Sequence, residues 1–375
     1  MDLDFTSEQD MLRDSAAKFL ANEFNFEMLR GLEESDAGYS PELWNHMAEL
    51  GWLGLPFPEE VGGFGGTFMD LAIIQEEIGK ALLPSPYFST IVLCGTLILE
   101  GGSDDQKTNL IEHISGGELI MALAQYEEDG SYRETGITMA ATQSGDGYEL
   151  SGTKLFVMDA NIAQKLIVAA RTPDGDVTLF IVDADAQGVS IEKLPTVGKD
   201  NTCAVTFAKV GVSGSDVLGA VGGGWALLES MRAKGAVAKA AEMVGGCKTS
   251  ITMSVEYAKE REQYGKPIGG NQAIQHYLSN MLLGYDSAHS YLYKVVSMID
   301  DGANVEKEAA IMKACVNESF KFITERSVQI HGGVGTSREH NIGLFYRRAK
   351  SWETVCGNSD MLYDQIVENL ANAYS

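Results

Sequence analysis

The stretch that decides the fold is YAKEREQYGKPI at residues 257–268, followed by QAIQH at residues 272–276. It ends one helical pattern with the cation Arg261 and the aromatic Tyr264 on one turn, and the next pattern starts with amide side chains such as Gln272. A cation beside an aromatic ring at a helix end suits a pyrophosphate and an adjacent planar ring. A polar loop between two helices is the alternative reading of this stretch on its own.

A second segment, QIHGGVG at residues 329–335, carries closely spaced glycines after a helical pattern. Glycines allow backbone N–H groups to approach a ligand closely. A glycine-rich helix stop explains the segment equally well when it is taken alone.

Helical patterns surround both segments, at residues 225–264, 272–299, 305–330 and in a last stretch to residue 373. The spacing predicts an inward face of a helix bundle made by Ile274, Leu278, Met281, Leu282, Tyr285 and Leu292.

The first part of the chain is helical in pattern and the middle part is not. Thr6 and Gln9 form a capping-box pattern before an amphipathic run, and further helical patterns cover residues 41–50, 68–81 and 89–100. From Glu118 the apolar runs become short, and the pairs Asp146-Gly147 and Asp174-Gly175 indicate turns between strands. We expect an α+β multidomain protein with an N-terminal helical domain (1–116), a middle β-barrel-like domain (117–217) and a C-terminal four-helix bundle (218–375).

Composition excludes several classes of function. The chain has 375 residues and a net charge of −25, which disfavours nucleic acid and anionic membrane surfaces as partners. Its apolar runs are far shorter than a membrane span, and its N-terminus shows no secretory signal, so we expect a cytoplasmic protein. Five cysteines without CxxC spacing and six scattered histidines indicate neither a disulfide framework nor a metal site.

Taken together and in this order, these segments resemble the acyl-CoA dehydrogenase family along nearly the whole chain. The resemblance includes PEEVGGFG at residues 58–65, R-x-x-[FY]-G-x-x-I from Arg261, Q-x-x-G-G-x-G from Gln329, and the helix start RRAK at residues 347–350.

The resemblance implies a flavoprotein that holds FAD between the β domain and the bundle, with the ADP end reaching a neighbouring subunit. The positions that match cofactor contacts in the family are Arg261, Tyr264, Gln272, Gln329, Gly332 and Gly333. It also implies a tetramer, an acyl-CoA substrate and electron-transfer flavoprotein as electron acceptor. In the implied reaction a carboxylate removes the α-proton while the β-hydrogen leaves as hydride to the flavin, giving a 2-enoyl-CoA.

The chain departs from the family pattern at the catalytic base. The usual glutamate lies nine residues after the arginine that matches Arg347, and this position is Cys356. The glutamate that other members place on an earlier helix falls at Gly235. The sequence therefore does not identify the catalytic base. The simplest interpretation of Cys356 is a small buried residue that fills the space of the missing glutamate and has no catalytic role.

Three acidic residues are candidates for a displaced base. Glu353 and Asp360 would share a face with Cys356 if one helix ran through all three, although Gly357 argues against such a helix. Glu242 is an acid in an otherwise apolar helical pattern, which fits either catalytic use or a paired structural acid.

A second departure concerns the loop that borders the flavin. Where the family has T-E-P-x-A-G-S-D, the chain has QYEEDGS at residues 125–131, and the companion W-[IV]-[TS]-N segment is LFVMDA at residues 155–160. The acids Glu127, Glu128 and Asp129 would oppose a flavin anion if they pointed inward.

These departures are similar to a subset of the family that degrades steroid side chains and alicyclic or aromatic acids, in which some enzymes are heterotetramers with one subunit that lacks the glutamate. The resemblance therefore implies such a base-lacking subunit, and a self-sufficient homotetramer for bulky or cyclic acyl-CoA is the second reading. A third is different chemistry on the same scaffold, such as enoyl-CoA reduction or β-elimination.

Overall fold

The computed structural model describes residues 5–374, with side chains to residue 371. By its internal contacts the described chain divides into two compact units. Unit 1 contains residues 5–30, 68–83 and 236–374, and unit 2 contains residues 31–67 and 84–235.

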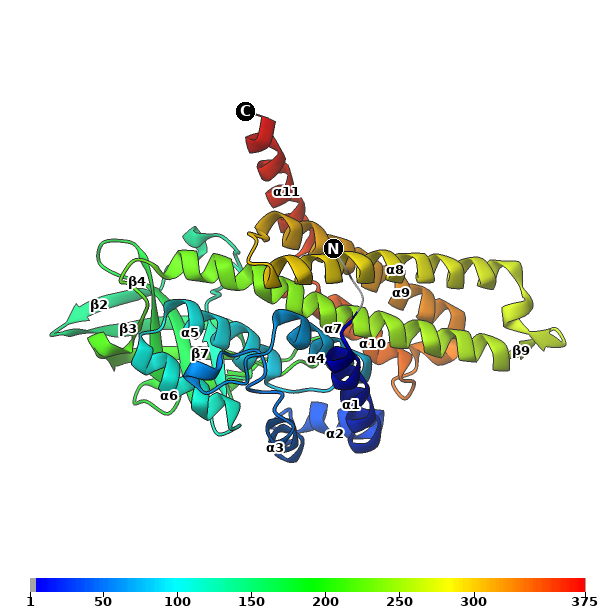
Figure 1. The fold of residues 1–375 in the computed structure, drawn as a ribbon, viewed down its shortest axis with the longest axis horizontal. Coiled ribbons are helices and arrows are strands. Elements are labelled where there is room, and N and C mark those ends of the chain that lie inside the picture. Colours follow the sequence, from blue (N-terminus) through cyan, green and yellow to red (C-terminus); the bar gives the residue numbers. More distant parts are fainter. Residues whose placement is uncertain (1–4, 375) are drawn as a thin grey trace. The chain divides into compact units, whose positions relative to one another are not determined.

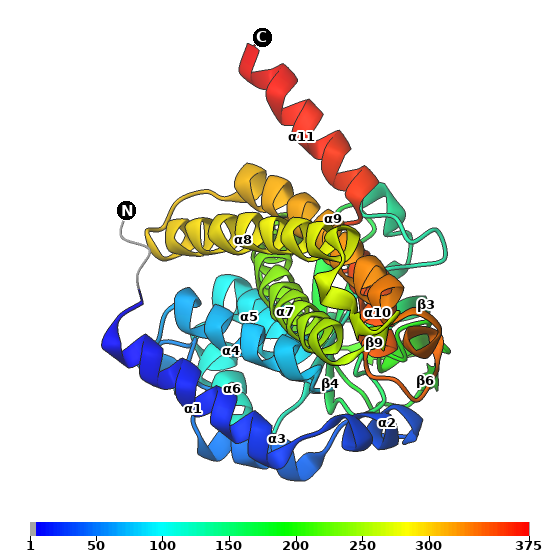
Figure 2. The same ribbon diagram turned by 90° about the vertical axis from the view of Figure 1, so that its right-hand side faces the viewer.

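Unit 1 is helical. Its elements are α1 (Ser7–Glu23), the start of α2 (Phe26–Glu34), α4 (Phe68–Ala81), most of α7 (Gly224–Glu260), β9 (Glu262–Gln263), β10 (Lys266–Pro267), η5 (Ile268–Gly270), α8 (Gln272–Asp300), α9 (Glu306–His331), η6 (Gly332–Thr336), α10 (Ile342–Trp352) and α11 (Ser359–Tyr374). The views in Figures 1 and 2 show α8 and α9 side by side, while α11 projects away from them.

The start of α1 follows its sequence signal, whereas the end of α7 does not. The capping box at α1 is present, because Gln9 N donates to Thr6 Oγ1 and Thr6 N donates to Gln9 Oε1. The predicted helix through residue 264 is four residues too long at its C-terminal end, because α7 ends at Glu260 and the chain then turns back in a hairpin. On α8 the predicted inward face is wrong at Leu282, which is 46% exposed, whereas Met281 and Tyr285 are buried.

Helices α4 and α7 cross at two glycines. A Cβ on Gly79 would lie 1.9 Å from Glu242 O, and a Cβ on Gly245 would lie 2.0 Å from Glu76 O. Since real Cβ atoms never approach a carbonyl oxygen so closely, the crossing requires glycine on both helices. This contact fixes the part of α7 that carries Glu242.

Unit 2 is built on a mixed eight-stranded sheet with the order β6-β7-β3-β2-β4-β5-β8 and with β1 parallel to β4. Its strands are β1 (Met121–Ala124), β2 (Ala140–Ser144), β3 (Gly147–Met158), β4 (Lys165–Arg171), β5 (Val177–Asp183), β6 (Val189–Lys193), β7 (Thr202–Val212) and β8 (Val217–Leu218). The remaining elements are the end of α2, α3 (Pro41–Glu49), η1 (Glu59–Val61), η2 (Tyr87–Cys94), α5 (Gly95–Gly101), α6 (Asp104–Ser115), η3 (Glu134–Gly136), η4 (Gly214–Asp216) and the start of α7.

Two features of unit 2 refine the sequence pattern. The β2–β3 turn is Gly145-Asp146, one residue earlier than the predicted pair, because Gly147 already pairs with Ser144. The helical pattern from residue 89 begins as a π-helix, η2, whose eight residues are all buried. π-helical segments occur often at functional sites.

The chain thus has N-terminal helices, a middle sheet and C-terminal helices, in agreement with the fold class expected from its sequence. Among residues 5–374, no helix combines the length and apolarity that a membrane crossing needs.

Candidate functional site

The residues after α7 form a small hairpin. Arg261 N donates to Tyr257 O (2.8 Å), and β9 then pairs with β10 through a two-residue turn, Tyr264-Gly265. Both turn residues have positive φ, 54° and 77°, as a type I′ turn requires. Arg261 and Tyr264 therefore do not share a helical turn, which corrects the sequence expectation, and the Tyr264 side chain is 100% exposed at the hairpin tip.

The glycine-rich segment lies at the same end of unit 1 as this hairpin. The ring of Tyr257 stacks on His331 with 4.4 Å between centroids, and Tyr257 Oη donates to His331 O (3.4 Å). Because His331 ends α9 and Tyr257 lies one turn before the end of α7, both segments singled out in the sequence meet here. Gly332 has φ 63°, and added Cβ atoms on Gly332 and Gly333 would meet nothing within 4 Å.

The six expected cofactor-contacting residues are all exposed in the single chain. Arg261 and Tyr264 belong to the hairpin segment, Gln272 begins α8, and Gln329, Gly332 and Gly333 border the end of α9. The set offers a cation, a free aromatic face, two amides and open glycine backbone. This chemistry fits the pyrophosphate and ring of FAD.

Cys356 lies in the turn between α10 and α11. It is buried, its φ is 57°, and the following Gly357 has φ 127°. Since α10 ends at Trp352 and α11 begins at Ser359, no single helix joins Glu353, Cys356 and Asp360.

A buried lysine, which sequence reasoning missed, lies beneath this turn. The Nζ of Lys313 on α9 donates to Asn317 Oδ1 (2.5 Å), Trp352 O (3.2 Å) and Glu353 O (3.3 Å). Burial lowers the pKa of Lys313 to about 7, while negative charge on Cys356 or Glu353 would raise it and Lys239 lowers it further. In the sequence, the only indication that Lys313 is buried is its position as a single charge within the apolar face of α9.

The three candidate displaced bases, Glu353, Asp360 and Glu242, differ from one another in their contacts and exposure. Glu353 Oε1 accepts from Ser359 Oγ (3.1 Å), and Asp360 is exposed in the first turn of α11. Glu242 forms a buried ion pair with Lys239, whose ammonium lies 5.0 Å from the centre of the Trp352 ring. Gly235, at the other possible base position, is a buried residue of α7.

In unit 2, the acidic loop after β1 is arranged around one ion pair. Glu127 Oε1 accepts from Lys154 Nζ (2.6 Å) and from the backbone N–H groups of Thr138 and Met139 (3.0 Å each). Burial opposes the ionisation of Glu127, but these hydrogen bonds outweigh it and lower the pKa of its carboxyl. Glu128 and Asp129 are exposed, so within unit 2 these two acids do not point into its core.

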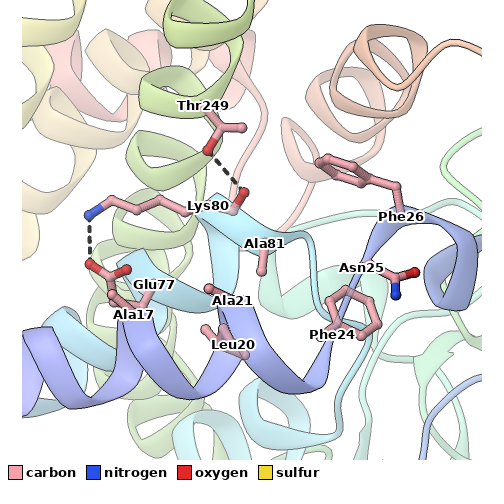
Figure 3. A pocket seen from close by; sticks show the side chains of 10 residues that line it. All are labelled: Ala17, Leu20, Ala21, Phe24, Asn25, Phe26, Glu77, Lys80, Ala81 and Thr249. Carbon is pink, nitrogen blue, oxygen red and sulfur yellow. Dashed lines mark hydrogen bonds and ion pairs between the residues drawn. The ribbon is translucent and has the colours of Figure 1, made fainter.

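A pocket of about 270 Å³ opens in unit 1 beside α1, α4 and α7 (Figure 3). Its walls include Leu20, Phe24 and Phe26, and Lys80 lies at its edge bonded to Glu77 (2.6 Å). None of the six expected cofactor residues lines it.

Comparisons with known proteins agree with this architecture. The chain matches the family models for the acyl-CoA dehydrogenase N-terminal domain (residues 6–118), middle domain (122–210) and C-terminal domain (222–371). It is 30% identical to the 3-(aryl)acrylate reductase of Clostridium sporogenes, over 98% of this chain and 99% of the relative.

Two solved structures are similar over nearly their whole length. Butyryl-CoA dehydrogenase from Megasphaera elsdenii superposes with a TM-score of 0.91 at 26% identity, covering 99% of this chain and 100% of the other. A variant of the Tcur3481-Tcur3483 steroid ACAD superposes with a TM-score of 0.88 at 28% identity, covering 98% of both chains.

Proposed function

Because the chain belongs to the acyl-CoA dehydrogenase family, whose members are FAD flavoproteins, we propose that it is the base-lacking subunit of a heterotetrameric acyl-CoA dehydrogenase. The proposed reaction is α,β-dehydrogenation of a bulky or cyclic acyl-CoA thioester to the 2-enoyl-CoA. The partner subunit, a second chain of the same family, supplies the catalytic glutamate.

The observation that carries this proposal is that a buried cysteine, Cys356, occupies the position where the resemblance places the base, and that the three candidate displaced bases have other surroundings. Glu353 is bonded to Ser359, Glu242 is paired with Lys239, and Asp360 faces solvent. A general base must lie within hydrogen-bond reach of the proton that it removes, and none of these three carboxylates occupies position 356. The nearby amine of Lys313 is bonded within the fold to Asn317 Oδ1 and to the backbone carbonyls of Trp352 and Glu353.

The chain's own residues contribute FAD binding in this proposal. Arg261 holds a phosphate, Tyr264 lies against a planar ring, and the open backbone at Gly332 and Gly333 admits the pyrophosphate closely. Gln272 and Gln329 complete the set with amide donors. The chemistry that bound FAD supplies is acceptance of hydride, and electron-transfer flavoprotein is the proposed partner that takes the electrons onward.

Two similarities support a bulky or cyclic acyl group. One is the steroid ACAD at 28% identity, and the other is the aryl-acrylate reductase at 30% identity. The same reductase favours a second candidate function, which is reduction of the α,β double bond of an unsaturated acyl group by reversal of the same hydride and proton movements.

The decisive experiment measures flavin per chain, by absorbance, together with native mass, on the chain expressed alone and with a family chain that carries the glutamate. We expect little flavin or a smaller assembly from the chain alone, and a flavin-loaded heterotetramer from co-expression. One FAD per chain in an active homotetramer of this chain would contradict the base-lacking subunit. A screen of acyl-CoA and enoyl-CoA thioesters on the loaded protein then separates dehydrogenation from reduction.

A further inference from the structure

The pocket beside α1, α4 and α7 has two chemically different ends (Figure 3). At one end, Lys80 Nζ donates to Glu77 Oε1 (2.6 Å). At the other end lie the rings of Phe24 and Phe26, and the side chain of Ala81 lies between the two ends. All the lining residues belong to unit 1. A molecule that fills this pocket therefore meets charge at one end and hydrocarbon at the other.

The apolar end is held in place by the chain itself. Asn25 Oδ1 accepts from the backbone N–H groups two and three residues later, both at 3.0 Å, and this side chain caps the start of α2. The cap holds the turn that carries Phe24 and Phe26. Phe24 is 6% exposed, and the ring of Phe26 packs edge-on against Phe345 with 5.8 Å between centroids. A preformed apolar wall binds hydrocarbon without the cost of ordering its own side chains.

The charged end has unused hydrogen-bonding capacity. Glu77 is 4% exposed, and among residues 5–371 only Lys80 donates to its carboxylate, through Oε1, so Oε2 accepts no hydrogen bond there. Lys80 Nζ lies 2.6 Å from Glu77 Oε1 and 3.0 Å from Glu76 Oε1, which accounts for two of its three N–H donors. Burial raises the pKa of Glu77, because a buried carboxylate with few hydrogen bonds is costly to charge. In the described part of the chain, one acceptor oxygen and one N–H donor thus remain side by side for a ligand.

The charges around this end disfavour a charged ligand. An added carboxylate would lie beside Glu77, with Glu76 bonded to the same lysine, and like charges at such distances repel each other. An added ammonium would lie beside Lys80 and in the field of Arg13, whose charge lowers the pKa of Glu77 against the effect of burial. An uncharged hydroxyl both donates and accepts, so it matches the acceptor and the donor together.

We propose that this pocket binds a small uncharged alcohol with a hydrocarbon body. Its hydroxyl donates to Glu77 Oε2 and accepts from Lys80 Nζ, and its hydrocarbon lies against Leu20, Phe24 and Phe26. Apolar walls hold water poorly and take up hydrocarbon instead. The volume of about 270 Å³ is at the lower limit for small-molecule pockets, so the alcohol is small. The site shares no residue with the set proposed for FAD, and the inference does not depend on the proposed heterotetramer.

The first test compares three probes that share one hydrocarbon ring and differ in the polar group: cyclohexanol, cyclohexanecarboxylate and cyclohexylammonium. Binding to the full chain is measured near neutral pH by ligand-observed NMR titration. We expect cyclohexanol to bind at least about tenfold more tightly than either charged probe. This comparison uses the unaltered protein, so it does not depend on the folding of any variant.

Three variants then locate the binding site. Ala21→Trp places a large ring in the pocket from an exposed position on α1, and Ser15→Trp is the matched control, because Ser15 is also exposed on α1 but does not line the pocket. Glu77→Gln keeps the shape of the side chain and removes its charge. We expect Ala21→Trp to abolish cyclohexanol binding and Ser15→Trp to leave its Kd unchanged. Glu77→Gln raises the Kd about tenfold, since hydrogen bonds to a charged acceptor are stronger.

Several results would overturn the inference. No detectable cyclohexanol binding, or equal affinities for the three probes, would refute the alcohol as ligand. Cyclohexanol that binds Ala21→Trp as tightly as the unaltered chain would lie at another site. A native mass that Ala21→Trp lowers and Ser15→Trp does not would show that a second chain covers the pocket. Flavin content and turnover are measured separately, so a failure of the alcohol site leaves the proposed function standing.

Discussion

At the scale of single residues, our proposal makes position 356 the one that decides whether the chain can catalyse dehydrogenation alone. Cys356→Glu places a carboxylate at the position where the sequence resemblance predicts the usual base of the family. General-base catalysis contributes roughly 10²- to 10⁴-fold in rate, so we expect this variant to create or greatly raise dehydrogenation of simple acyl-CoAs. The measurement is reduction of an artificial electron acceptor by flavin-loaded protein.

Cys356→Gln is the control, since it has nearly the same shape as glutamate and no basic oxygen pair. A rate for Cys356→Glu no higher than that of Cys356→Gln would show that the substrate pocket of this chain is not intact.

Lys313 predicts a specific pH dependence of stability. Its folded pKa is about 7, whereas an exposed lysine titrates near 10.4. Between these values the unfolded chain binds more protons than the folded one, so the free energy of unfolding rises with pH, by at most roughly 1.4 kcal/mol per pH unit. Below pH 7 the full cost of burying the charge is present.

Urea unfolding at pH 6, 8 and 9.5 checks this, with Lys313→Met as the test and the exposed Lys294→Met as control. We expect the rise in stability to disappear in Lys313→Met only. Equal pH slopes in the wild-type protein and Lys313→Met would show that the amine is not held neutral in the fold.

Sequence reasoning selected candidate cofactor residues that stand in local patterns, and it missed Lys313, whose place beside Cys356 depends on contacts between distant parts of the chain. Arg261, Gly332 and Gly333 stand in recognisable segments, and their roles stay predictions. Lys313 lies more than forty residues from Cys356, and only the packing of α9 under the end of α10 brings them together. Nothing local to Cys356 indicates a cation.

At the scale of elements, the hairpin after α7 depends on the left-handed conformation of Tyr264 and Gly265. A side chain in this conformation costs roughly 1–2 kcal/mol. We expect Gly265→Ala to distort the turn and reduce FAD affinity about tenfold, with little change in the thermal midpoint. Flavin retained after dialysis and a thermal scan measure the two effects.

Gly302→Ala is the matched control, because Gly302 also has positive φ and open space around it but connects α8 to α9. If Gly265→Ala and Gly302→Ala lose flavin equally, the loss comes from backbone strain in general and not from a role of the hairpin in FAD binding.

The crossing of α4 and α7 gives a second prediction at this scale. Gly245→Ala would force the helices apart, because its Cβ meets a carbonyl oxygen at 2.0 Å. Overpacking of this kind costs about 3 kcal/mol of unfolding free energy. Gly284→Ala on α8, whose nearest neighbour is 3.8 Å away, should instead stabilise by up to roughly 1 kcal/mol. Chemical unfolding of both variants compares them, and a harmless Gly245→Ala would refute the close crossing.

Element prediction succeeded where the apolar period was strong and failed where polar strands or turns intervened. The helix at Phe68–Ala81 has the bounds that its pattern predicts. Strands β2, β6 and β7 were not identified; the side chains of β2 and β6 are mostly exposed and give little apolar signal, whereas β7 alternates between buried and exposed residues. The end of α7 was overestimated because Ile268 N bonds back to Arg261 O, a contact that no local periodicity contains.

At the scale of the whole molecule, charge is the dominant property. With 53 acidic and 28 basic residues, the folded chain repels itself, and salt screens this repulsion. We expect the thermal midpoint to rise by a few degrees between about 0.05 M and about 0.5 M NaCl. A thermal scan at both salt concentrations, repeated with KCl, tests it. A midpoint that falls with salt would mean that attractive ion pairs outweigh the repulsion.

The cysteines have one more consequence. Cys94, Cys203, Cys247 and Cys356 are buried, and Cys315 alone is half-buried. A thiol reagent added to the native protein therefore reaches one sulfur first, and this sulfur lies on α9 close enough to α11 to influence Tyr363. A fluorophore can therefore be attached to Cys315 without any mutation. Its fluorescence would report changes in the surroundings of α9 and α11.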